Sequence, residues 1–355
     1  MPRTACRCQN VRHGLHCIVP PYMLEHLAES SDANTRAAAR EAIESSAELR
    51  TTRRVLRGFG ALPSAVPANP KRHRLVYDAG HGNMAALPGR LVRTEGQRKV
   101  ADSAVNEAYE HSGTTYDFYR QRFGRLSLDG NGMTLVSSVH LGNRLNNAFW
   151  NGQQMAYGDG DGSAFVHFTR SLDIVAHELA HGVISHECNL EYRDEPGALN
   201  EHFADVFGML VRQWKRKETA ASSDWLIGTE VMGPATTARA LRSFGPDKAY
   251  ANDPLLGDDP QPKHLRDKYV GSWDYGGVHV NSGILNHAFY LFARAVGGKA
   301  WLKPGAIWYE AMRMLSSNSQ FADMVSTTSM IASARHGANG KIHRALMNAW
   351  KSVGL

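Results

Sequence analysis

The stretch SLDIVAHELAHGVISHE, residues 171–187, decides the fold, because it reads as a helix with two different faces. Val175, Leu179 and Val183 recur every four residues and make one face apolar. His177 and His181 lie one helical turn apart on another face. Two imidazoles at this spacing can bind one Zn²⁺, and Glu178 can act as a base toward a water that the metal activates. The stretch therefore predicts a helix that carries two zinc ligands.

A third ligand is available on the next predicted helix. Glu201 lies in GALNEHFAD, residues 197–205, where the helical apolar pattern resumes. Three protein ligands leave one position open for water, which is typical of catalytic zinc and not of structural zinc. Asp205 lies four residues after Glu201 and faces the same way, so it can accept the free ring N–H of a zinc-bound histidine. The alternative is that both carboxylates only decorate a solvated helix face.

Composition limits the class of protein. The chain has 355 residues, a formal net charge of +6 and no block of Lys and Arg with interleaved aromatics, so we expect no nucleic-acid partner. No apolar run is long enough for a signal peptide or a membrane span. We therefore expect synthesis in the cytosol without membrane association, with any export by a non-classical route, and a monomer. Only Cys188 lies beyond the first 17 residues, so the core must form without a disulfide framework.

Ahead of the strand-rich part, the chain reads as a head, a helix and a linker. Residues 31–57 are rich in Ala, Arg and Glu, and Ser31 or Asp32 is placed to cap a helix there. Residues 58–74 are rich in Gly, Pro and basic side chains, which predicts a linker that proteases can reach. We expect residues 1–57 to form one unit and this linker to contain the processing site.

The rest of the chain predicts an α+β fold of two lobes. From residue 75 to about 170, segments such as RLVYDA, GRLSLDG and GMTLVSSVHLG predict strands, with one helix at 99–112. From residue 171 onward the apolar pattern is helical. We expect a β-rich N-terminal lobe at 75–206, which includes the HELAH helix, and a helical C-terminal lobe at 207–355.

Several blocks occur in one order between Leu75 and the C-terminus: NNAFWNGQQMAYGDGDG, HELAHG, GALNEHFAD, LRSFGPD and GGVHVNSG. Together they resemble the thermolysin family of zinc metalloendopeptidases, the gluzincins. The family's usual HELTH is HELAH here, a change outside the ligands. The resemblance implies a thermolysin-like, two-lobed metalloprotease with one catalytic Zn²⁺ between the lobes. Peptides and proteins would be its substrates.

The resemblance also assigns roles to residues. His177, His181 and Glu201 would bind zinc, while Glu178 would be the general base that later protonates the leaving amine. A developing oxyanion needs hydrogen-bond donors beside the metal. Residues that match this task, and the carboxylate that orients the histidine, are Tyr192, His279 and Asp274.

Substrate-binding positions are implied in the same way. Asn147 and Ala148 match positions that bind substrate backbone, and Arg242 matches one that hydrogen-bonds a substrate carbonyl. An apolar pocket on the primed side would be lined by Phe165, Ile174, Ile227, Val231 and Leu241. Filling such a pocket with a large apolar side chain stabilises binding by roughly 1.5–3 kcal/mol. We therefore expect cleavage on the N-terminal side of Leu, Phe, Ile or Val.

One departure concerns the family's paired calcium site. A hard dication needs about six or more oxygen ligands. Of the matching positions, three keep carboxylates and three do not: Asp173, Asp224 and Glu230 against Arg212, Leu226 and Thr229. We expect Arg212 to take the place of the metal by pairing with the remaining carboxylates, so that calcium binding is lost or weakened. The repeat GDGDG at 158–162 predicts a tight turn in preference to a calcium loop.

The head of the chain resembles the short propeptide of the protealysin-like branch of the family. In HGLHCIVPPYMLEH, residues 13–26, Pro20 and Pro21 pre-extend the backbone, which is the form that a protease cleft binds. The resemblance implies that this Pro-Pro segment lies in the cleft as an intramolecular inhibitor. Tyr22, Met23 and Leu24 would fill apolar subsites, and the helix at 31–57 would clamp the segment. A self-processing precursor is the result.

Some alternatives stay open. Another HExxH hydrolase, such as an aminopeptidase, is disfavoured by the backbone-binding block NNAFW. A catalytically impaired peptide-binding protein of the same fold is the main alternative, and the intact set of Glu178, Tyr192 and His279 argues against it. The cysteines and histidines of the head fit a second metal site, a thiolate that reaches the catalytic zinc, or a reactive tail; they are Cys6, Cys8, His13, His16 and Cys17.

Overall fold

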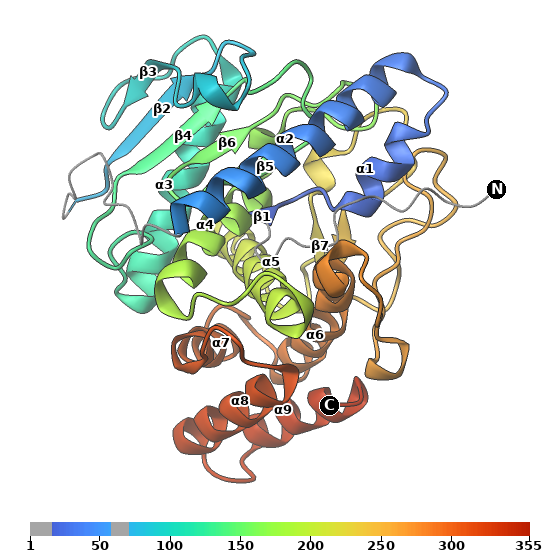
Figure 1. Ribbon diagram of the computed structural model, residues 1–355. Helices are drawn as coiled ribbons and strands as arrows, with labels where there is room; N and C mark the ends of the chain where they lie inside the picture. Colours follow the sequence, from blue (N-terminus) through green and yellow to red (C-terminus); the bar gives the residue numbers. More distant parts are fainter. Residues whose placement is uncertain (1–15, 58–70) are drawn as a thin grey trace.

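The computed structural model describes residues 16–57 and 71–355, which form two lobes packed around a pair of central helices (Figure 1). The central pair is α4 (Leu172–Glu187) and α5 (Asp194–Arg216). Gly208 of α5 lies so close to α4 that a Cβ there would be 2.6 Å from the carbonyl oxygen of Asp173. A glycine at this position therefore lets the two helices that carry the HELAH and GALNEHFAD motifs approach closely.

A mixed sheet forms most of the N-terminal lobe, with strand order β1-β5-β6-β4-β2-β3 (Figure 1). Strands β2, β4 and β6 run parallel to one another, and the other pairs are antiparallel. The bounds are β1 His16–Cys17, β2 Arg74–Asp78, β3 Arg90–Thr94, β4 Leu135–Val139, β5 Ala148–Trp150 and β6 Met155–Tyr157. The edge strand β1 comes from the head of the chain, so the head completes the sheet of the catalytic lobe.

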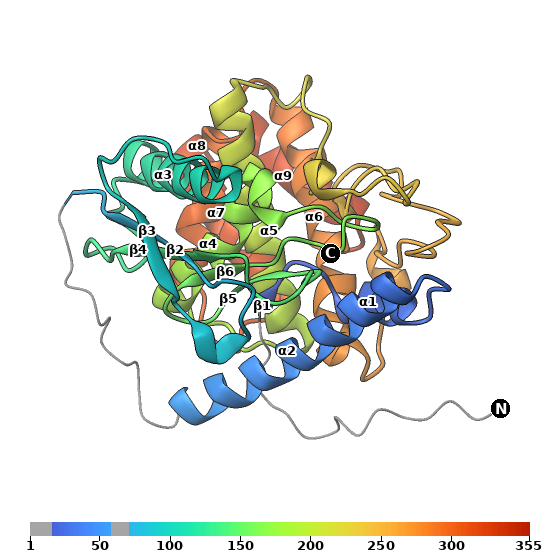
Figure 2. The ribbon, with the colours of Figure 1, turned by 90° about the horizontal axis from the view of Figure 1, so that it is seen from above.

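Helices make up most of the C-terminal lobe, and two further helices come from the head of the chain. Below the central pair lie α7 to α9, whereas α1 and α2 cross one face of the molecule (Figures 1 and 2). A two-stranded sheet, β7 (Leu226–Ile227) with β8 (Arg242–Ser243), lies beyond α5 in the chain. The remaining helices are α1 Pro21–Ala28, α2 Ala33–Arg57, α3 Ser103–Phe123, α6 Asp274–Val296, α7 Lys303–Met314, α8 Phe321–His336 and α9 Lys341–Ser352. In these described parts, no helix has both the length and the apolar character needed to cross a bilayer.

The structure confirms two lobes of the predicted α+β type, with corrections to individual elements. The helix expected at 31–57 is α2, and the backbone N–H of Thr35 donates to the Asp32 carboxylate over 2.7 Å. The helix expected at 99–112 begins later and is longer, because Asp102 caps it and it continues to Phe123. The segment GRLSLDG, 124–130, is a loop and not a strand. There Arg125 and Ser127 hydrogen-bond nearby backbone carbonyls, which competes with a strand ladder.

The Pro-Pro segment also differs from the prediction. Pro20 is extended, with φ −67° and ψ 157°, but Pro21 is the first residue of α1. Proline is well suited to this position because its missing N–H has no partner in the first helical turn anyway. Tyr22, Met23 and Leu24 consequently lie on a buried helix and not on an extended peptide. Cys6, Cys8 and His13, and residues 58–70 of the predicted linker, lie outside the described residues.

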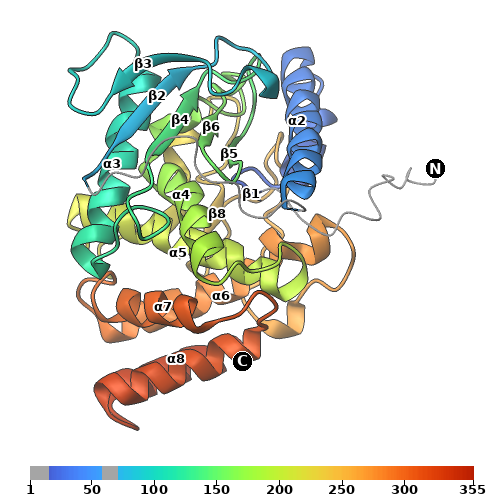
Figure 3. The same cartoon turned by 60° about the vertical axis from the view of Figure 1, so that its left-hand side comes forward.

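Helix α2 lies along the side of the catalytic lobe (Figure 3). Its Glu41 carboxylate accepts a hydrogen bond of 2.8 Å from the backbone N–H of Asn143, in the loop between β4 and β5. On α1, the Tyr22 ring lies against Trp273 with 5.3 Å between ring centroids. Glu25 accepts a hydrogen bond from the Trp273 indole N–H. The head of the chain thus contacts both lobes.

Candidate active site

The HELAH helix and its neighbour bring three predicted ligands together. The Nε2 atoms of His177 and His181 lie 3.0 Å apart. Each carboxylate oxygen of Glu201 lies 3.5 Å from one of these nitrogens. All three side chains are completely buried. Zn–N and Zn–O bonds of about 2.0–2.1 Å place tetrahedral ligands roughly 3.3 Å from one another, so the group fits one zinc ion.

Burial gives an independent test of that fit. Among the described residues, no donor hydrogen-bonds to Oε2 of Glu201, although this oxygen is shielded from solvent. Its ion-pair neighbours are the ring nitrogens of His177, at 3.5 Å, and His279, at 3.6 Å. A buried carboxylate oxygen without a hydrogen bond is costly unless a cation compensates it. The donor set therefore matches a bound dication.

The far nitrogens of the two histidines are held by α5. Nδ1 of His177 lies 2.9 Å from Oδ1 of Asp205, the residue expected to orient a zinc histidine. Nδ1 of His181 lies 2.9 Å from Oδ1 of Asn200, which the sequence analysis missed. Its position directly before Glu201 in GALNEHFAD could have indicated this role. Both contacts direct Nε2 of each ring toward the same point.

Asp205 is also the centre of a buried charge network. It accepts hydrogen bonds from Nε and Nη2 of Arg242 and from the Asn286 amide at 2.8–3.0 Å. Burial alone raises the pKa of the Asp205 carboxyl, but Arg242 and His177 outweigh it and hold the pKa far below its usual value. The ion pair therefore stays charged and fixes Arg242 at the cleft.

His279 is held in one orientation by the start of α6. Oδ1 of Asp274 lies 2.6 Å from Nδ1 of His279, and Oδ2 accepts the backbone N–H groups of His279 and Val280. Asp274 and Tyr275 have φ of 52° and 55°, which is the left-handed region, in a turn that directs this carboxylate back at the ring. The Tyr192 hydroxyl lies 3.0 Å from Nε2 of His279. Tyr192 and His279 thus lie beside Glu201, and Asp274 holds the far nitrogen of His279.

Glu178 lies on the sheet side of the ligands. One of its carboxylate oxygens accepts the backbone N–H of Trp150 in β5 over 3.0 Å, and its side chain is fully buried. The helix thereby places the predicted base against strand β5.

Residues 17–19 of the head occupy the cleft and contact the predicted substrate-binding residues. Val19 exchanges two hydrogen bonds with the Asn147 side chain, at 3.1 and 3.4 Å. The Ile18 N–H donates to the Ala148 carbonyl over 3.2 Å, and Arg242 donates to the Ile18 carbonyl over 2.9 Å. The Cys17 carbonyl oxygen lies 3.2 Å from Nε2 of His279. The segment in the cleft is therefore Cys17–Val19, directly ahead of Pro20 and Pro21.

The five predicted pocket residues are all completely buried: Phe165, Ile174, Ile227, Val231 and Leu241. The Leu241 N–H donates to the Ile227 carbonyl where β7 pairs with β8. Gly228 lies between them with φ of 75°, and a Cβ there would meet the side chains of Leu241 and Ile174. The structure therefore brings at least three of these apolar residues to one place.

Arg212 lies where the resemblance puts the calcium carboxylates. It is fully buried, donates to the Asp173 carboxylate and the Leu226 carbonyl at 3.0 and 2.6 Å, and pairs with Asp224. Burial lowers the pKa of an arginine, but these carboxylates outweigh it and raise the pKa of Arg212. The expected pairing is therefore present for Asp173 and Asp224, whereas Glu230 pairs with Arg216.

Comparison with known proteins identifies the family. Residues 68–185 match the thermolysin metallopeptidase catalytic domain, and residues 188–355 match that family's α-helical domain. An extracellular metalloprotease of Pectobacterium carotovorum is 40% identical over 342 residues, which are 95% of this chain and 96% of the relative. The chain belongs to the thermolysin family. It is accordingly a metalloendopeptidase, and the family implies a catalytic zinc ion.

Two further proteins are similar to this thermolysin-family chain. Protease PrtS of a Photorhabdus strain is 44% identical over 288 residues, 80% of this chain and 76% of its own. The solved precursor of protealysin, a metalloproteinase from Serratia proteamaculans, superposes with a TM-score of 0.85 at 42% identity. It covers 96% of this chain and 99% of its own. The match to a precursor, head included, means that this endopeptidase has a propeptide; a peptide-binding protein without activity is not favoured.

Proposed function

We propose that the chain is a self-processing endopeptidase in which His177, His181 and Glu201 hold the zinc ion. Their convergence in a buried site, with an unsatisfied oxygen of Glu201, is the observation that carries this assignment. When bound, zinc supplies Lewis acidity that polarises a carbonyl and makes water more acidic. Asp205 and Asn200 orient the two histidines, so that the ligands are preorganised.

The remaining residues perform the proton and charge steps. Glu178 takes a proton from the attacking water and delivers it to the leaving amine. Tyr192 and His279 stabilise the oxyanion that forms on the substrate carbonyl, and Asp274 keeps His279 in the orientation for this task. The contact of His279 with the Cys17 carbonyl supports this role, because that carbonyl lies where a substrate carbonyl would lie.

Substrate recognition follows the contacts of the head. Asn147, Ala148 and Arg242 bind substrate backbone, as they bind Ile18 and Val19. We propose that the apolar set predicted for the primed-side pocket selects Leu, Phe, Ile or Val after the cleaved bond. We also propose a monomer that acts without nucleic acid or membrane.

Residues 1–57 act as an intramolecular inhibitor in this proposal, and residues 58–74 contain the processing site. Cys17–Val19 lies in the cleft where strand β1 ends, while Pro20 is extended and Pro21 begins α1. Two prolines directly after Val19 restrict the backbone at little entropic cost. Replacing both prolines with alanine should speed self-processing or lower the precursor yield, as followed by mass spectrometry of the purified chain. Unchanged maturation would argue against this role.

One experiment tests the assignment of function. The wild-type chain and Glu178→Ala are incubated with casein, and the new N-termini are sequenced. We expect digestion by the wild type with large apolar residues at the new N-termini, and a loss of at least about 10²-fold in the variant, since general-base catalysis contributes about 10²–10⁴-fold. Glu178→Ala keeps all three zinc ligands, so its zinc content should be unchanged. Equal digestion by both chains, or charged residues at the new N-termini, would contradict the proposal.

A further inference from the structure

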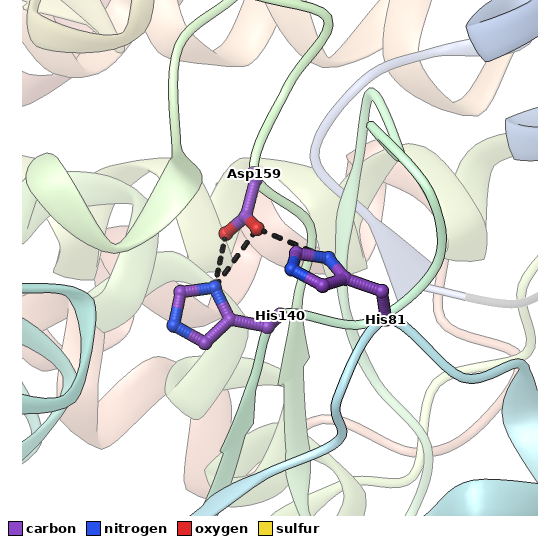
Figure 4. A group of neighbouring side chains, drawn as sticks. All are labelled: His81, His140 and Asp159. Atoms are coloured by element: carbon purple, nitrogen blue, oxygen red, sulfur yellow. Dashed lines mark hydrogen bonds and ion pairs between the residues drawn. The ribbon is translucent and has the colours of Figure 1, made fainter. Parts of the chain in front are cut away.

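A second group of histidines and carboxylate lies outside the active site, at the end of the sheet (Figure 4). Nδ1 of His140 lies 2.9 and 2.8 Å from the two oxygens of Asp159. Nδ1 of His81 lies 3.6 Å from Oδ2 of the same carboxylate. The three side chains can each place one ligand atom within 4.8 Å of the others. Figure 4 shows both rings turned toward Asp159.

The topology of the sheet explains why these residues meet. Strands β2, β4 and β6 are parallel neighbours. His81, His140 and Asp159 follow them by three, one and two residues respectively. The carboxyl ends of parallel strands open at one edge of a sheet, which is where such sheets commonly bind ligands. Three residues far apart in the sequence are therefore brought together by the order of the strands.

A further carboxylate supports His140 from behind. Its Nε2 lies 2.8 Å from Oδ2 of Asp102, the residue that caps α3. A metal-ligating histidine almost always has its other nitrogen bonded to such a group, which fixes the ring and increases its basicity. His140 thus has one nitrogen held by Asp102 and the other directed at Asp159 and His81.

The backbone at both histidines is also constrained. His81 and His140 have φ of 59° and 55°, and the His81 N–H donates to the His140 carbonyl over 2.8 Å. Non-glycine residues in this left-handed region are uncommon, and they cluster at functional sites. The direct backbone contact keeps the two imidazoles adjacent, with ring centroids 5.5 Å apart.

We propose that His81, His140 and Asp159 form a second site for a zinc-like transition metal, distinct from the catalytic centre. Two imidazoles and one carboxylate suit zinc and its neighbours, whereas calcium and magnesium prefer all-oxygen sites. The His81 side chain is 59% exposed, so the remaining coordination positions face solvent. The carboxylates of Asp159 and Asp102 together would neutralise the two positive charges of the ion.

The position of the site gives it a consequence for the cleft. His140 opens the loop that runs to Asn147, the residue whose side chain holds Val19. The same loop donates the Asn143 N–H to Glu41 of α2. A metal bound at the start of this loop stabilises the segment that contacts both the head of the chain and the substrate.

The competing occupant of the site is a proton. The hydrogen bond to Asp159, and then that to Asp102, raises the pKa of His140 to about 9 although burial opposes this. Without metal, an imidazolium between two carboxylates accounts for the same geometry. Because a metal must displace this proton from Nδ1, the test is made at pH 8 and not at acidic pH.

The test counts metal ions per chain. Full-length chain carrying Glu178→Ala, to prevent self-cleavage, is dialysed against excess zinc at pH 8, and bound zinc is measured by mass spectrometry. We expect two zinc ions per chain, and one after His81→Ala. That variant keeps the contacts among Asp102, His140 and Asp159, so it should still fold, as checked by its circular dichroism. His336→Ala, on the distant α8, is the matched control and should keep two.

A second variant tests the contact between Asp102 and His140 without removing any of the three proposed metal ligands. Asp102→Asn still caps α3, since asparagine is an equally good cap. It should weaken binding of the second zinc about 10- to 100-fold and leave the first unchanged. One zinc per parent chain, or two in His81→Ala, would overturn the proposal and leave the proton as occupant. With Glu178 intact, His81→Ala should keep most of the casein-digesting activity, so failure of this site leaves the proposed function untouched.

Discussion

The described part of the chain holds two groups of two histidines and a carboxylate, and the two groups differ mainly in burial. His177, His181 and Glu201 lie on adjacent turns of packed helices and are completely buried. His81, His140 and Asp159 lie on loops, with one ring largely in solvent. In both groups a further carboxylate holds the far nitrogen of one histidine. The comparison teaches that burial, and not residue type, determines whether such a group depends on its cation.

The physical reason is the absence of water in the buried group. A buried carboxylate oxygen with no hydrogen bond is strongly destabilising unless a cation lies next to it. At the surface, water and a protonated His140 are alternatives, so the same donors tolerate an empty state. We therefore expect tight, essential binding at the first group and exchangeable binding at the second. The following predictions test this difference, in order of decreasing effect.

The largest effect is expected from removing a ligand in the buried group. His181→Ala should lose one zinc ion per chain and at least about 10³-fold of the casein-digesting activity, because the metal supplies several kcal/mol of transition-state stabilisation. His140→Gln, the matched change in the surface group, should keep most of this activity. Zinc content and initial rates of both variants check the prediction. Similar losses in both would break the comparison.

Next in size is the removal of a buried charge. Arg212→Met leaves Asp173 buried without its partner and should lower the free energy of unfolding by about 3–5 kcal/mol. Arg216→Met removes an exposed pair with Glu230 and should cost no more than about 1 kcal/mol. Urea unfolding of both, in the Glu178→Ala background, measures the difference.

The wild-type Arg212 carries a related expectation. From the sequence we propose that Arg212 takes the place of the calcium ion, and on that basis added calcium should not raise the melting temperature of the wild type at fixed zinc. A substantial rise would show that the arginine has not replaced the ion.

A smaller effect is expected from the support of a zinc ligand. Asn200→Ala removes the oxygen that lies 2.9 Å from Nδ1 of His181 and should weaken zinc binding about 10- to 100-fold. Competition with a chelator measures this affinity, and Asn348→Ala on the surface of α9 is the control. An unchanged affinity would mean that α4 alone orients His181.

The smallest effect is a pH dependence of stability from His140, which faces Asp159, Asp102 and His81. Its pKa of about 9 in the folded chain lies above the usual value of about 6.5. The stabilisation is therefore complete below pH 6.5 and is lost as pH rises through 9. The free energy of unfolding, measured with urea and without added metal, should fall as the pH rises from 6.5 to above 9. The fall should be larger for the Glu178→Ala parent than for the same chain with His140→Gln, by less than about 1 kcal/mol. Parallel pH profiles would exclude this role.

The sequence predicted the site better than the elements around it. His177 and His181 lie one turn apart on a single helix, so helical periodicity put them on one face. Glu201 lies on the next helix and was assigned from the motif GALNEHFAD. GRLSLDG has the alternation of a strand, but hydrogen bonds from Arg125 and Ser127 to nearby carbonyls make it a loop. The alternation of apolar and polar residues does not show that side chains will compete for the backbone hydrogen bonds of a strand.

Two features depend on long-range pairing and escaped prediction for that reason. Asn200 matters only because α5 packs against His181. His81, His140 and Asp159 meet only because three strands are parallel neighbours, which no spacing along the chain reveals. Pro21 was expected in an extended peptide, yet its ring is equally compatible with a first helical turn, and the packing of α1 decided between them.

The pairing of β1 with β5 has a consequence for solubility. Strand β5 is only three residues long, and β1 covers its outer edge. An uncovered strand edge is a template for association with another chain. In the proposed function, release of the head would expose the edge to which substrates bind, and the same edge would then be open to a second copy of the enzyme. The shortness of β5 limits that contact to a few backbone hydrogen bonds, which favours transient peptides over lasting aggregates.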